Sequence, residues 1–190
     1  MKDVETVIRK AKYINGPLGA PCTRILKRDV RKEWEEGKGD LCYFWGLDVT
    51  EKDRCARILM SMPNQKHRFP LVEQNIDKEM AHSLLKKANI SRPFMYELGF
   101  HNNNCIGCVK GGKGYWNLIR KKFPEVFKKR AALEREIGAS CINGTFLDEL
   151  SESLGHLPTK IEDDCNILCE VKYLESTDVG AAKLPCCGET

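Results

Sequence analysis

The chain has 190 residues, of which 42% are hydrophobic and 31% charged, and its formal net charge is +4 at neutral pH. This composition is ordinary for a globular protein, and the length suits one domain with a sizeable core, alone or followed by an extension. No apolar run approaches the ~20 residues of a membrane span, and the charged start lacks the apolar stretch of a secretory signal. We therefore expect the ten cysteines to lie in the reducing cytoplasm, with some thiols as ligands rather than in a disulfide scaffold.

Apolar residues at helical spacing predict two helices at the start of the chain. The first covers 4–14 and ends at an Asn-Gly-Pro turn. The second begins at Cys22 and ends near Gly37, with Leu26, Val30 and Trp34 on its inner face. A short apolar run over 41–47 then predicts a buried strand, and the helices on either side of it favour a parallel sheet.

The chain after this strand is mainly helical. We expect a helix with Cys55 and Ile58 on its inner face, a second apolar segment over 68–72, and a helix capped by Asp77 that turns Met80 and Leu84 inward. A short helix follows Pro93 and ends at Gly99, and two more cover 115–122 and 124–137.

From 138 onward the helical pattern weakens, and only 145–150 predicts a short element. The expected fold class is therefore α/β, with a mainly parallel sheet flanked by helices. We expect this α/β domain over 1–137 and a loop-rich, cysteine-rich extension over 138–190.

The most informative motif lies between His101 and Trp116. Cys105 and Cys108 form a Cys-x-x-Cys pair with Gly107 between them, and a tight turn of this kind lets two thiolates face one metal ion or cluster. The pair is half of a site, because tetrahedral zinc and cubane iron–sulfur clusters take about four protein ligands. The alternatives are an oxidisable dithiol, or two cysteines buried as small apolar side chains.

Other cysteines can complete the set of ligands. Cys22 opens a predicted helix, where the helix dipole favours the thiolate. Cys165 and Cys169 form a second close pair, and we expect one of them to join Cys22, Cys105 and Cys108. Cysteine-only ligation suits a [4Fe–4S] cluster or zinc. The next candidates for the remaining ligand are Cys42, Cys55 and His101.

Charge is distributed unevenly along the chain. A segment between 110 and 135 holds nine basic residues and two acids, another basic group surrounds Cys22, and the segment 145–170 holds seven acids and one lysine. The basic segments indicate an anionic partner such as nucleotide phosphate, sulfate or nucleic acid. The alternative is a set of solvated helix faces.

Two stretches are candidates for binding the anion. The polar loop and helix start after the strand at 41–47 hold Asp48, Asp53, Arg54 and Arg57, at the sheet edge where α/β proteins bind ligands; helix capping and surface pairing are the alternative roles. The glycine-rich stretch 110–114 is similar to a phosphate-binding loop, but no apolar strand precedes it.

Several of these segments together resemble a known family. They are Pro21-Cys22-Thr23-Arg24-Ile25-Leu26-Lys27, Trp45-Gly46-Leu47-Asp48 through Arg57, Phe69-Pro70-Leu71, Asn102-Asn103-Asn104-Cys105-Ile106-Gly107-Cys108-Val109-Lys110-Gly111-Gly112 with Gly114-Tyr115-Trp116, and Asp164-Cys165-Asn166-Ile167-Leu168-Cys169-Glu170. The chain resembles the phosphoadenosine phosphosulfate reductase family, in particular its phage and bacterial members, within the adenine nucleotide alpha hydrolase superfamily. The resemblance runs from about Val4 to Glu170.

The sequence departs from the family pattern at its beginning. Family members begin with a strand and a Ser-Gly-Gly-Lys-Asp-Ser-type phosphate loop, which this sequence does not show before Val4. The resemblance therefore implies an incomplete adenine nucleotide alpha hydrolase-like fold and weak ATP binding by this chain alone. The loop is either lost, supplied by a second chain, or part of a segment that this sequence omits. The family's first cysteine pair is represented only by Cys22, because Pro21 precedes it, which makes a C-terminal cysteine attractive as the fourth ligand and favours iron–sulfur. No catalytic residue is assigned, since the tail pair Cys186-Cys187 matches no family motif.

Two functions are therefore expected as alternatives. In the first, the chain is an enzyme, or part of one, that acts on an adenine or sulfur-bearing nucleotide, and Arg24, Lys27, Asp53, Arg54 and Arg57 line the substrate side. In the second, it is a non-catalytic module in which a metal staples the C-terminal region while basic faces bind nucleic acid or a partner protein.

Overall fold

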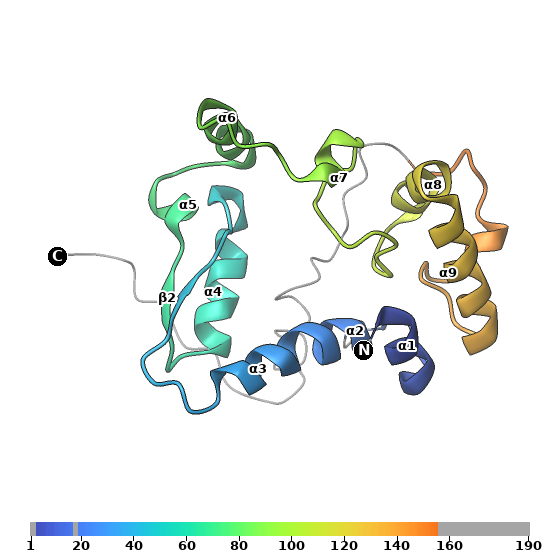
Figure 1. The fold of residues 1–190 in the computed structure, drawn as a ribbon, viewed down its shortest axis with the longest axis horizontal. Coiled ribbons are helices and arrows are strands. Elements are labelled where there is room, and N and C mark those ends of the chain that lie inside the picture. Colours follow the sequence, from blue (N-terminus) through green and yellow to red (C-terminus); the bar gives the residue numbers. More distant parts are fainter. Residues whose placement is uncertain (1–2, 17–18, 156–190) are drawn as a thin grey trace. The chain divides into compact units, whose positions relative to one another are not determined.

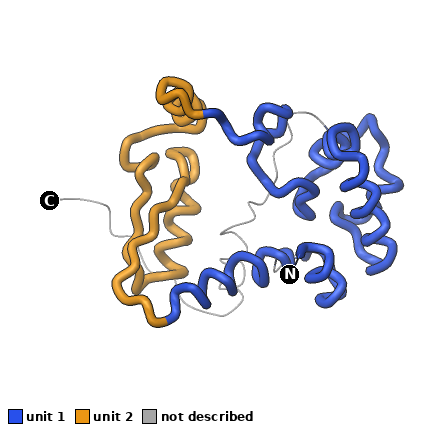
Figure 2. Tube along the Cα trace, in the orientation of Figure 1, with its two compact units in different colours: residues 1–36, 91–169 blue, residues 37–90, 170–190 orange. Residues whose placement is uncertain are grey.

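The computed structural model describes residues 3–16 and 19–155, which belong to two compact units. The described part of unit 1 comprises 3–16, 19–36 and 91–155, and that of unit 2 comprises 37–90 (Figure 2). Helices and a small parallel sheet are both present, so the expected α/β class is confirmed at this coarse level. Among the described helices, none has the length and apolar character needed to span a membrane.

Unit 2 is built on a strand–helix–strand motif. Strand β1 (Cys42–Phe44) pairs in parallel with β2 (Lys66–Arg68), and Cys42 lies opposite Lys66. The connection between them contains the short η2 (Val49–Glu51) and α4 (Lys52–Ser61) (Figure 1). Cys55 and Ile58 form the buried face of α4, so the sequence predicted both the parallel pairing and the inner face of this helix.

The two strands differ from expectation in burial and position. Phe44 is 69% exposed, and Cys42 is exposed as well, although a buried strand was predicted. The second strand consists of Lys-His-Arg and shares only Arg68 with the predicted apolar segment 68–72, whose last three residues belong to α5 (Pro70–Glu73) instead. Backbone hydrogen bonds define this pairing, and two short strands cannot enclose the side chains on both of their faces.

Stacked rings stabilise the strand pair. Tyr43 of β1 and Trp45 just after it lie 5.6 and 6.1 Å, between ring centroids, from His67 of β2, and Phe69 continues the stack. Trp45 Nε1 donates a hydrogen bond to His67 Nδ1 (3.0 Å), so the ring proton lies on Nε2, which donates to the carbonyl of Met62 (2.9 Å). Cross-strand pairs of this kind are the local unit of sheet stability.

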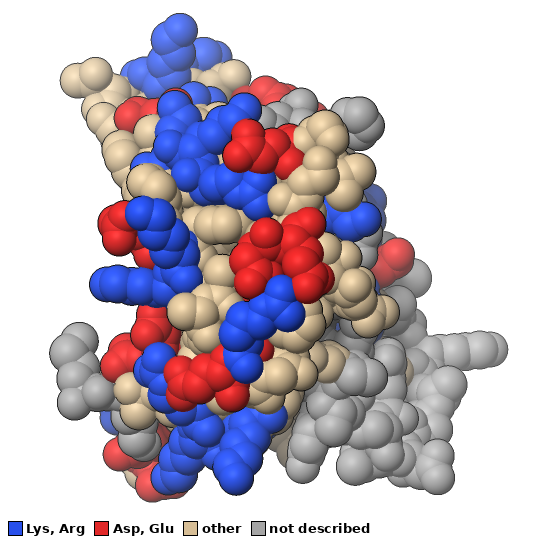
Figure 3. Space-filling view, turned by 90° about the vertical axis from the view of Figure 1, so that its right-hand side faces the viewer, with Lys and Arg blue, Asp and Glu red and all other residues tan. Residues whose placement is uncertain are grey.

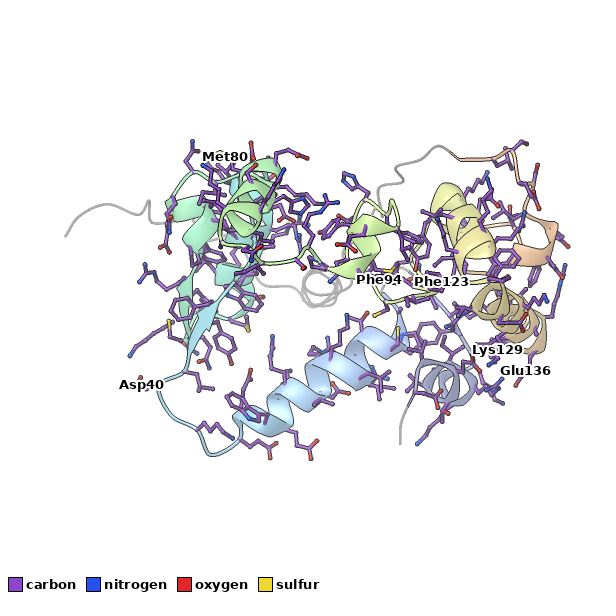
Figure 4. The ribbon with its side chains drawn as sticks, turned by 45° about the horizontal axis from the view of Figure 1, so that its top comes forward. Asp40, Met80, Phe94, Phe123, Lys129 and Glu136 are labelled. Atoms are coloured by element: carbon purple, nitrogen blue, oxygen red, sulfur yellow. The ribbon has the colours of Figure 1, made fainter. Side chains whose placement is uncertain are left out.

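Unit 2 ends with α6 (Lys78–Lys87). Its start was predicted correctly, because Asp77 Oδ1 accepts a hydrogen bond from the backbone N–H of Met80 (2.8 Å). The inner face of α6 was predicted wrongly, because Met80 and Leu84 are 49% and 48% exposed. Figure 4 shows the Met80 side chain at the edge of the helix. Periodicity identifies an apolar face but not the element that covers it.

Unit 1 begins with α1 (Val4–Ala11) and one long helical stretch. The stretch consists of α2 (Pro21–Thr23), the π-helical η1 (Arg24–Arg28) and α3 (Asp29–Glu35), in agreement with the predicted helix. Val30 and Trp34 are 53% and 58% exposed, so the predicted inner face is wrong beyond η1. A π-turn holds an extra residue, which rotates the faces that follow it relative to a regular 3.6-residue pattern.

The remaining helices of unit 1 enclose its core. They are the short α7 (Phe94–Glu97), α8 (Lys113–Lys122), α9 (Pro124–Ile137) and the 3-10 turn η3 (Leu147–Glu149), close to the predicted positions. Trp116 and Ile119 of α8, Leu133 of α9 and Leu147 are fully enclosed. The Phe123 ring at the α8–α9 junction, labelled in Figure 4, lies 6.5 Å from that of Phe100 between centroids.

A buried carboxylate holds the chain after α9 in place. Glu134 is fully buried, and its two carboxylate oxygens accept hydrogen bonds from the backbone N–H groups of Cys141 and Leu147. Burial raises the pKa of this carboxyl, while the same two amides lower it. The described part of the expected extension, 138–155, therefore packs in unit 1 with α9; the rest of 138–190 lies outside the described residues.

We expect Glu134→Ala to destabilise the protein by about 2–4 kcal/mol, because it leaves two buried amides without acceptors and opens a small cavity. Denaturant unfolding of the full chain measures this loss. Glu136→Ala on the same helix is the matched control, since its exposed ion pair with Arg9 is worth less than about 1 kcal/mol. Equal effects of the two substitutions would contradict the assigned role.

Candidate metal centre

Cys105 and Cys108 lie at the two ends of one tight turn in unit 1. The backbone N–H of Cys108 donates to the carbonyl of Cys105 (3.0 Å), and Gly107 adopts φ +73° between them. A Cβ atom on Gly107 would lie 2.6 Å from Cγ1 of Val126. The turn therefore needs glycine both for its backbone conformation and for its packing on α9.

The hydroxyl of Tyr115 fastens this turn to α8. It donates to the carbonyl of Cys105 (2.7 Å) and accepts from the backbone N–H of Cys108 (2.8 Å). Burial raises the pKa of Tyr115, so the hydroxyl keeps the proton that it donates. Gly111 makes room for the ring, because a Cβ there would lie 1.9 Å from Cδ1 of Tyr115. The two cysteine backbones are thus held in place without any metal.

Cys22 lies in the same unit as this turn. It is the second residue of the helix that starts at Pro21, as the sequence predicted, and its partly buried side chain packs against the core that also contains Cys108. Cys105, by contrast, is exposed. Three of the five predicted ligands therefore lie in unit 1, and Cys165 and Cys169 lie outside the described residues.

Sequence reasoning missed a further cysteine in this region. Cys141 is buried in the same core, near enough to Cys22 for the two thiols to influence each other electrostatically. Burial raises the pKa of the Cys141 thiol, and the Glu134 carboxylate adds to this rise while Arg130 opposes it. A thiol held in its protonated form is a poor metal ligand. No motif surrounds Cys141, so the sequence offered no signal for it.

The described side chains do not complete a metal site by themselves. Within 3–16 and 19–155, no three His, Cys, Asp or Glu residues are grouped closely enough to hold a metal ion. The runners-up Cys42 and Cys55 belong to unit 2, where Cys42 is exposed and burial raises the pKa of Cys55. His101 is exposed in unit 1. The preformed part of the site is therefore the turn from Cys105 to Cys108.

A buried cation lies beside this turn. Arg130 of α9 is only 5% exposed, and its Nη2 lies 3.9 Å from the position that a Cβ on Gly107 would occupy. Its Nη1 is buried without a hydrogen-bond acceptor in the described structure, and no ion pair to Arg130 is found there. A buried guanidinium ordinarily has an anion next to it. The Cys141 thiol is electrostatically coupled to this guanidinium and to the buried Glu134 carboxylate.

Some other cations of the basic segment are matched with acids or carbonyls. Arg120 donates to the carbonyls of Leu147 and Leu150, Lys128 pairs with Glu125, and Arg135 pairs with Asp148 and Glu149. Figure 3 shows the outcome: lysine and arginine alternate with acidic side chains over this face instead of forming one basic surface.

The glycine-rich stretch 110–114 is built differently from a phosphate loop. Lys110 is buried, and α8 begins after Gly112. Gly155 lies directly against the first turn of α8, because a Cβ on it would lie 2.2 Å from the backbone nitrogen of Gly114. The amide groups that would have to face a phosphate are thus covered by the chain itself.

The five predicted substrate residues fall into two sets. Arg24 and Lys27 are exposed on η1 in unit 1. Asp53, Arg54 and Arg57 lie on α4 in unit 2.

Local contacts occupy part of the set on α4. Arg54 bonds to Glu51, and Arg57 donates to the carbonyl of Asp53 (3.3 Å). Asp48 caps η2 through the N–H of Thr50 (2.8 Å), the alternative role given to it from sequence. That these residues line a substrate side remains a prediction.

Comparison with known proteins adds no relative of this chain. No protein-family model matches it, and neither the curated proteins nor the solved structures contain a match. The resemblance to the phosphoadenosine phosphosulfate reductase family therefore rests on the sequence segments alone.

We expect Tyr115→Phe to cost about 1–3 kcal/mol of stability, because it removes two buried hydrogen bonds at the cysteine turn. Hydrogen exchange provides the local measurement: the amide of Cys108 should exchange faster in the variant. Tyr13→Phe, at a 37% exposed tyrosine, is the control and should change neither quantity. An unchanged Cys108 amide in Tyr115→Phe would show that the hydroxyl does not hold the turn.

We expect Gly107→Ala to be more destabilising than Gly138→Ala. Both glycines have nearly the same φ, +73° and +72°, so alanine adds a similar backbone strain of about 1–2 kcal/mol at each. Only Gly107 has a neighbour closer than 3 Å to the new methyl group, whereas Gly138 faces open space. Thermal unfolding of the two variants measures the difference, and equal losses would contradict the close packing against Val126.

Proposed function

We propose that the chain carries a cysteine-ligated metal centre, a [4Fe–4S] cluster or zinc, as part of a phosphoadenosine phosphosulfate reductase-like enzyme. The centre is anchored on Cys105 and Cys108, and Cys22 together with Cys165 or Cys169 supplies the other thiolates. The single observation that carries this proposal is the cysteine turn itself. The hydroxyl of Tyr115 hydrogen-bonds the backbones of both cysteines, and the buried Arg130 lies near the turn.

Two physical arguments support this set of ligands. The first is charge: four thiolates around zinc or a [4Fe–4S] core form an anionic centre, which suits the environment of Arg130. The second is reach. Gly155 is packed against Gly114 on unit 1, and the ten residues from there to Cys165 can span up to about 33–36 Å. Ligation would add to folding, because the free energy of metal binding stabilises the ordered chain.

The nucleotide-related part of the proposal rests on the family resemblance and on unit 2. A parallel strand–helix–strand motif is the building block of doubly wound nucleotide-binding folds, and an incomplete adenine nucleotide alpha hydrolase-like fold is proposed on this basis. The residues proposed to contact an adenine or sulfur-bearing nucleotide are Arg24 and Lys27 of unit 1 and Asp53, Arg54 and Arg57 of unit 2. A second chain supplies the phosphate loop.

The alternative function is a non-catalytic, metal-stapled module that binds a partner. The partner is nucleic acid or a protein; of the α9 cations, Lys128 and Arg135 are already matched with acids. Nucleotide binding in the presence of the chain that supplies the phosphate loop separates the two functions: an adenine nucleotide protects the enzyme part from thermal unfolding but leaves the module unchanged.

We expect protein purified without oxygen to contain iron and acid-labile sulfide, or zinc, in stoichiometric amounts. Cys105→Ser should abolish this content because it removes half of the preformed turn. Cys55→Ser, in the other unit, is the matched control and should retain it. Elemental and sulfide analysis measures both variants. Wild-type protein that holds no metal after reconstitution, or a Cys105→Ser variant that holds as much as wild type, would refute the centre.

A further inference from the structure

We propose that the outer edge of β1 pairs with β1 of a second copy of this chain, in an antiparallel arrangement about a two-fold axis. This pairing concerns unit 2 alone and goes beyond the proposed metal centre, so either can fail without the other. Three features of the strand pair support it: the contrast in charge between its two edges, the backbone groups that β1 directs away from β2, and the fit of β1 to itself.

The sheet of unit 2 is small for a parallel one. Within the described residues it contains two strands of three residues each. Parallel pairing is slightly weaker per residue than antiparallel pairing, and a sheet of only two strands is marginally stable in water. Each strand therefore has one edge that no described strand pairs with. The face that carries Phe44 is open as well, since this side chain is 69% exposed.

The two edges of this sheet differ in charge. Strand β2 carries two exposed cations, each in an ion pair: Lys66 with Asp40 (3.1 Å) and Arg68 with Glu73 (2.7 Å). Charged side chains of this kind protect an edge strand from pairing with another chain. The segment 41–47, which contains β1, has no charged residue. Of the two edges, that of β1 is therefore the unprotected one.

The backbone of β1 has hydrogen-bonding groups at this edge. The N–H of Trp45 donates to the carbonyl of Arg68 (2.9 Å). Because peptide groups alternate in direction along a strand, Tyr43 also faces β2, whereas Cys42 and Phe44 direct their N–H and C=O groups away from it. Neither Cys42 nor Phe44 makes a further backbone hydrogen bond to the described part of the chain. A strand that pairs at this edge would satisfy these groups.

Strand β1 of a second copy fits this edge. Antiparallel strands bond through residues that both point outward, and a two-fold axis at Tyr43 places Cys42 of each copy opposite Phe44 of the other. The large ring then faces a small side chain, and like charges do not meet because 41–47 has none. Tyr43 meets Tyr43 of the other copy on the opposite face of the sheet. A foreign strand would have to be equally uncharged, and β1 is the one such strand among those described.

The mass of the full, reduced chain in solution tests this pairing. We expect the wild type to sediment as a concentration-dependent dimer. Phe44→Lys places a charge at the unprotected edge and should raise the dissociation constant of the dimer about tenfold or more. Met60→Lys is the matched control, since it adds the same charge at an apolar residue of α4 that is 52% exposed. It should leave the dissociation constant within about threefold of the wild-type value.

Cross-linking tests the register of the two strands. In Phe44→Cys, mild oxidation with diamide should join position 44 of one copy to Cys42 of the other, because opposite residues of an antiparallel pair lie about 4.5–5.5 Å apart between Cα atoms. Peptide mass spectrometry identifies the link. A further Cys42→Ser substitution in the same variant should abolish it. This measurement also decides the outcome if Phe44→Lys fails to fold.

Three results would overturn the pairing with a second copy. One is a wild-type chain that stays monomeric at its highest soluble concentration, whether the edge is then covered by the chain itself or pairs with another protein. The second is a dimer that Phe44→Lys and Met60→Lys weaken equally, because the contact would then lie elsewhere. The third is a dimer in which position 44 does not link to Cys42 of the other copy. The metal content of the protein is independent of all three.

Discussion

The hydroxyl of Tyr115 is the contact on which the candidate centre depends, because it bonds to both ends of the cysteine turn at once. Two glycines make that contact sterically possible, one inside the turn against Val126 and one beneath the tyrosine ring. The result is a pair of cysteine backbones placed by hydrogen bonds and packing alone. Because these backbones are already placed, metal binding at the turn would cost less conformational entropy.

Unit 1 combines this turn with two buried charges on one helix. Glu134 is used for folding, since it binds the amides of the chain that follows α9. Arg130, one helical turn earlier, has no comparable role among the described contacts. Elsewhere on α8 and α9, Arg120, Lys128 and Arg135 meet acids or carbonyls. These three cations of the basic segment are therefore matched within the chain itself.

Much of the helical framework could be predicted from sequence because its ends carry local signals: Asp77 caps α6, Pro124 starts α9 and Gly138 ends it. Features set by tertiary contacts could not. The polar strand Lys66–Arg68 is defined by backbone pairing, and the exposure of Val30 and Trp34 follows a π-turn that periodicity does not detect. The cysteine turn was visible as a motif, whereas Arg130 and Cys141 are distinguished only by burial.

The contact between Gly114 and Gly155 has a consequence for what this fold can become. Two residues without side chains touch at the start of α8, and the later one acts as a cover over the positive end of the helix dipole. Any side chain at Gly155 would clash with the backbone of Gly114 and Lys113. A single methyl group would therefore force a shift between the chain after η3 and the first turn of α8.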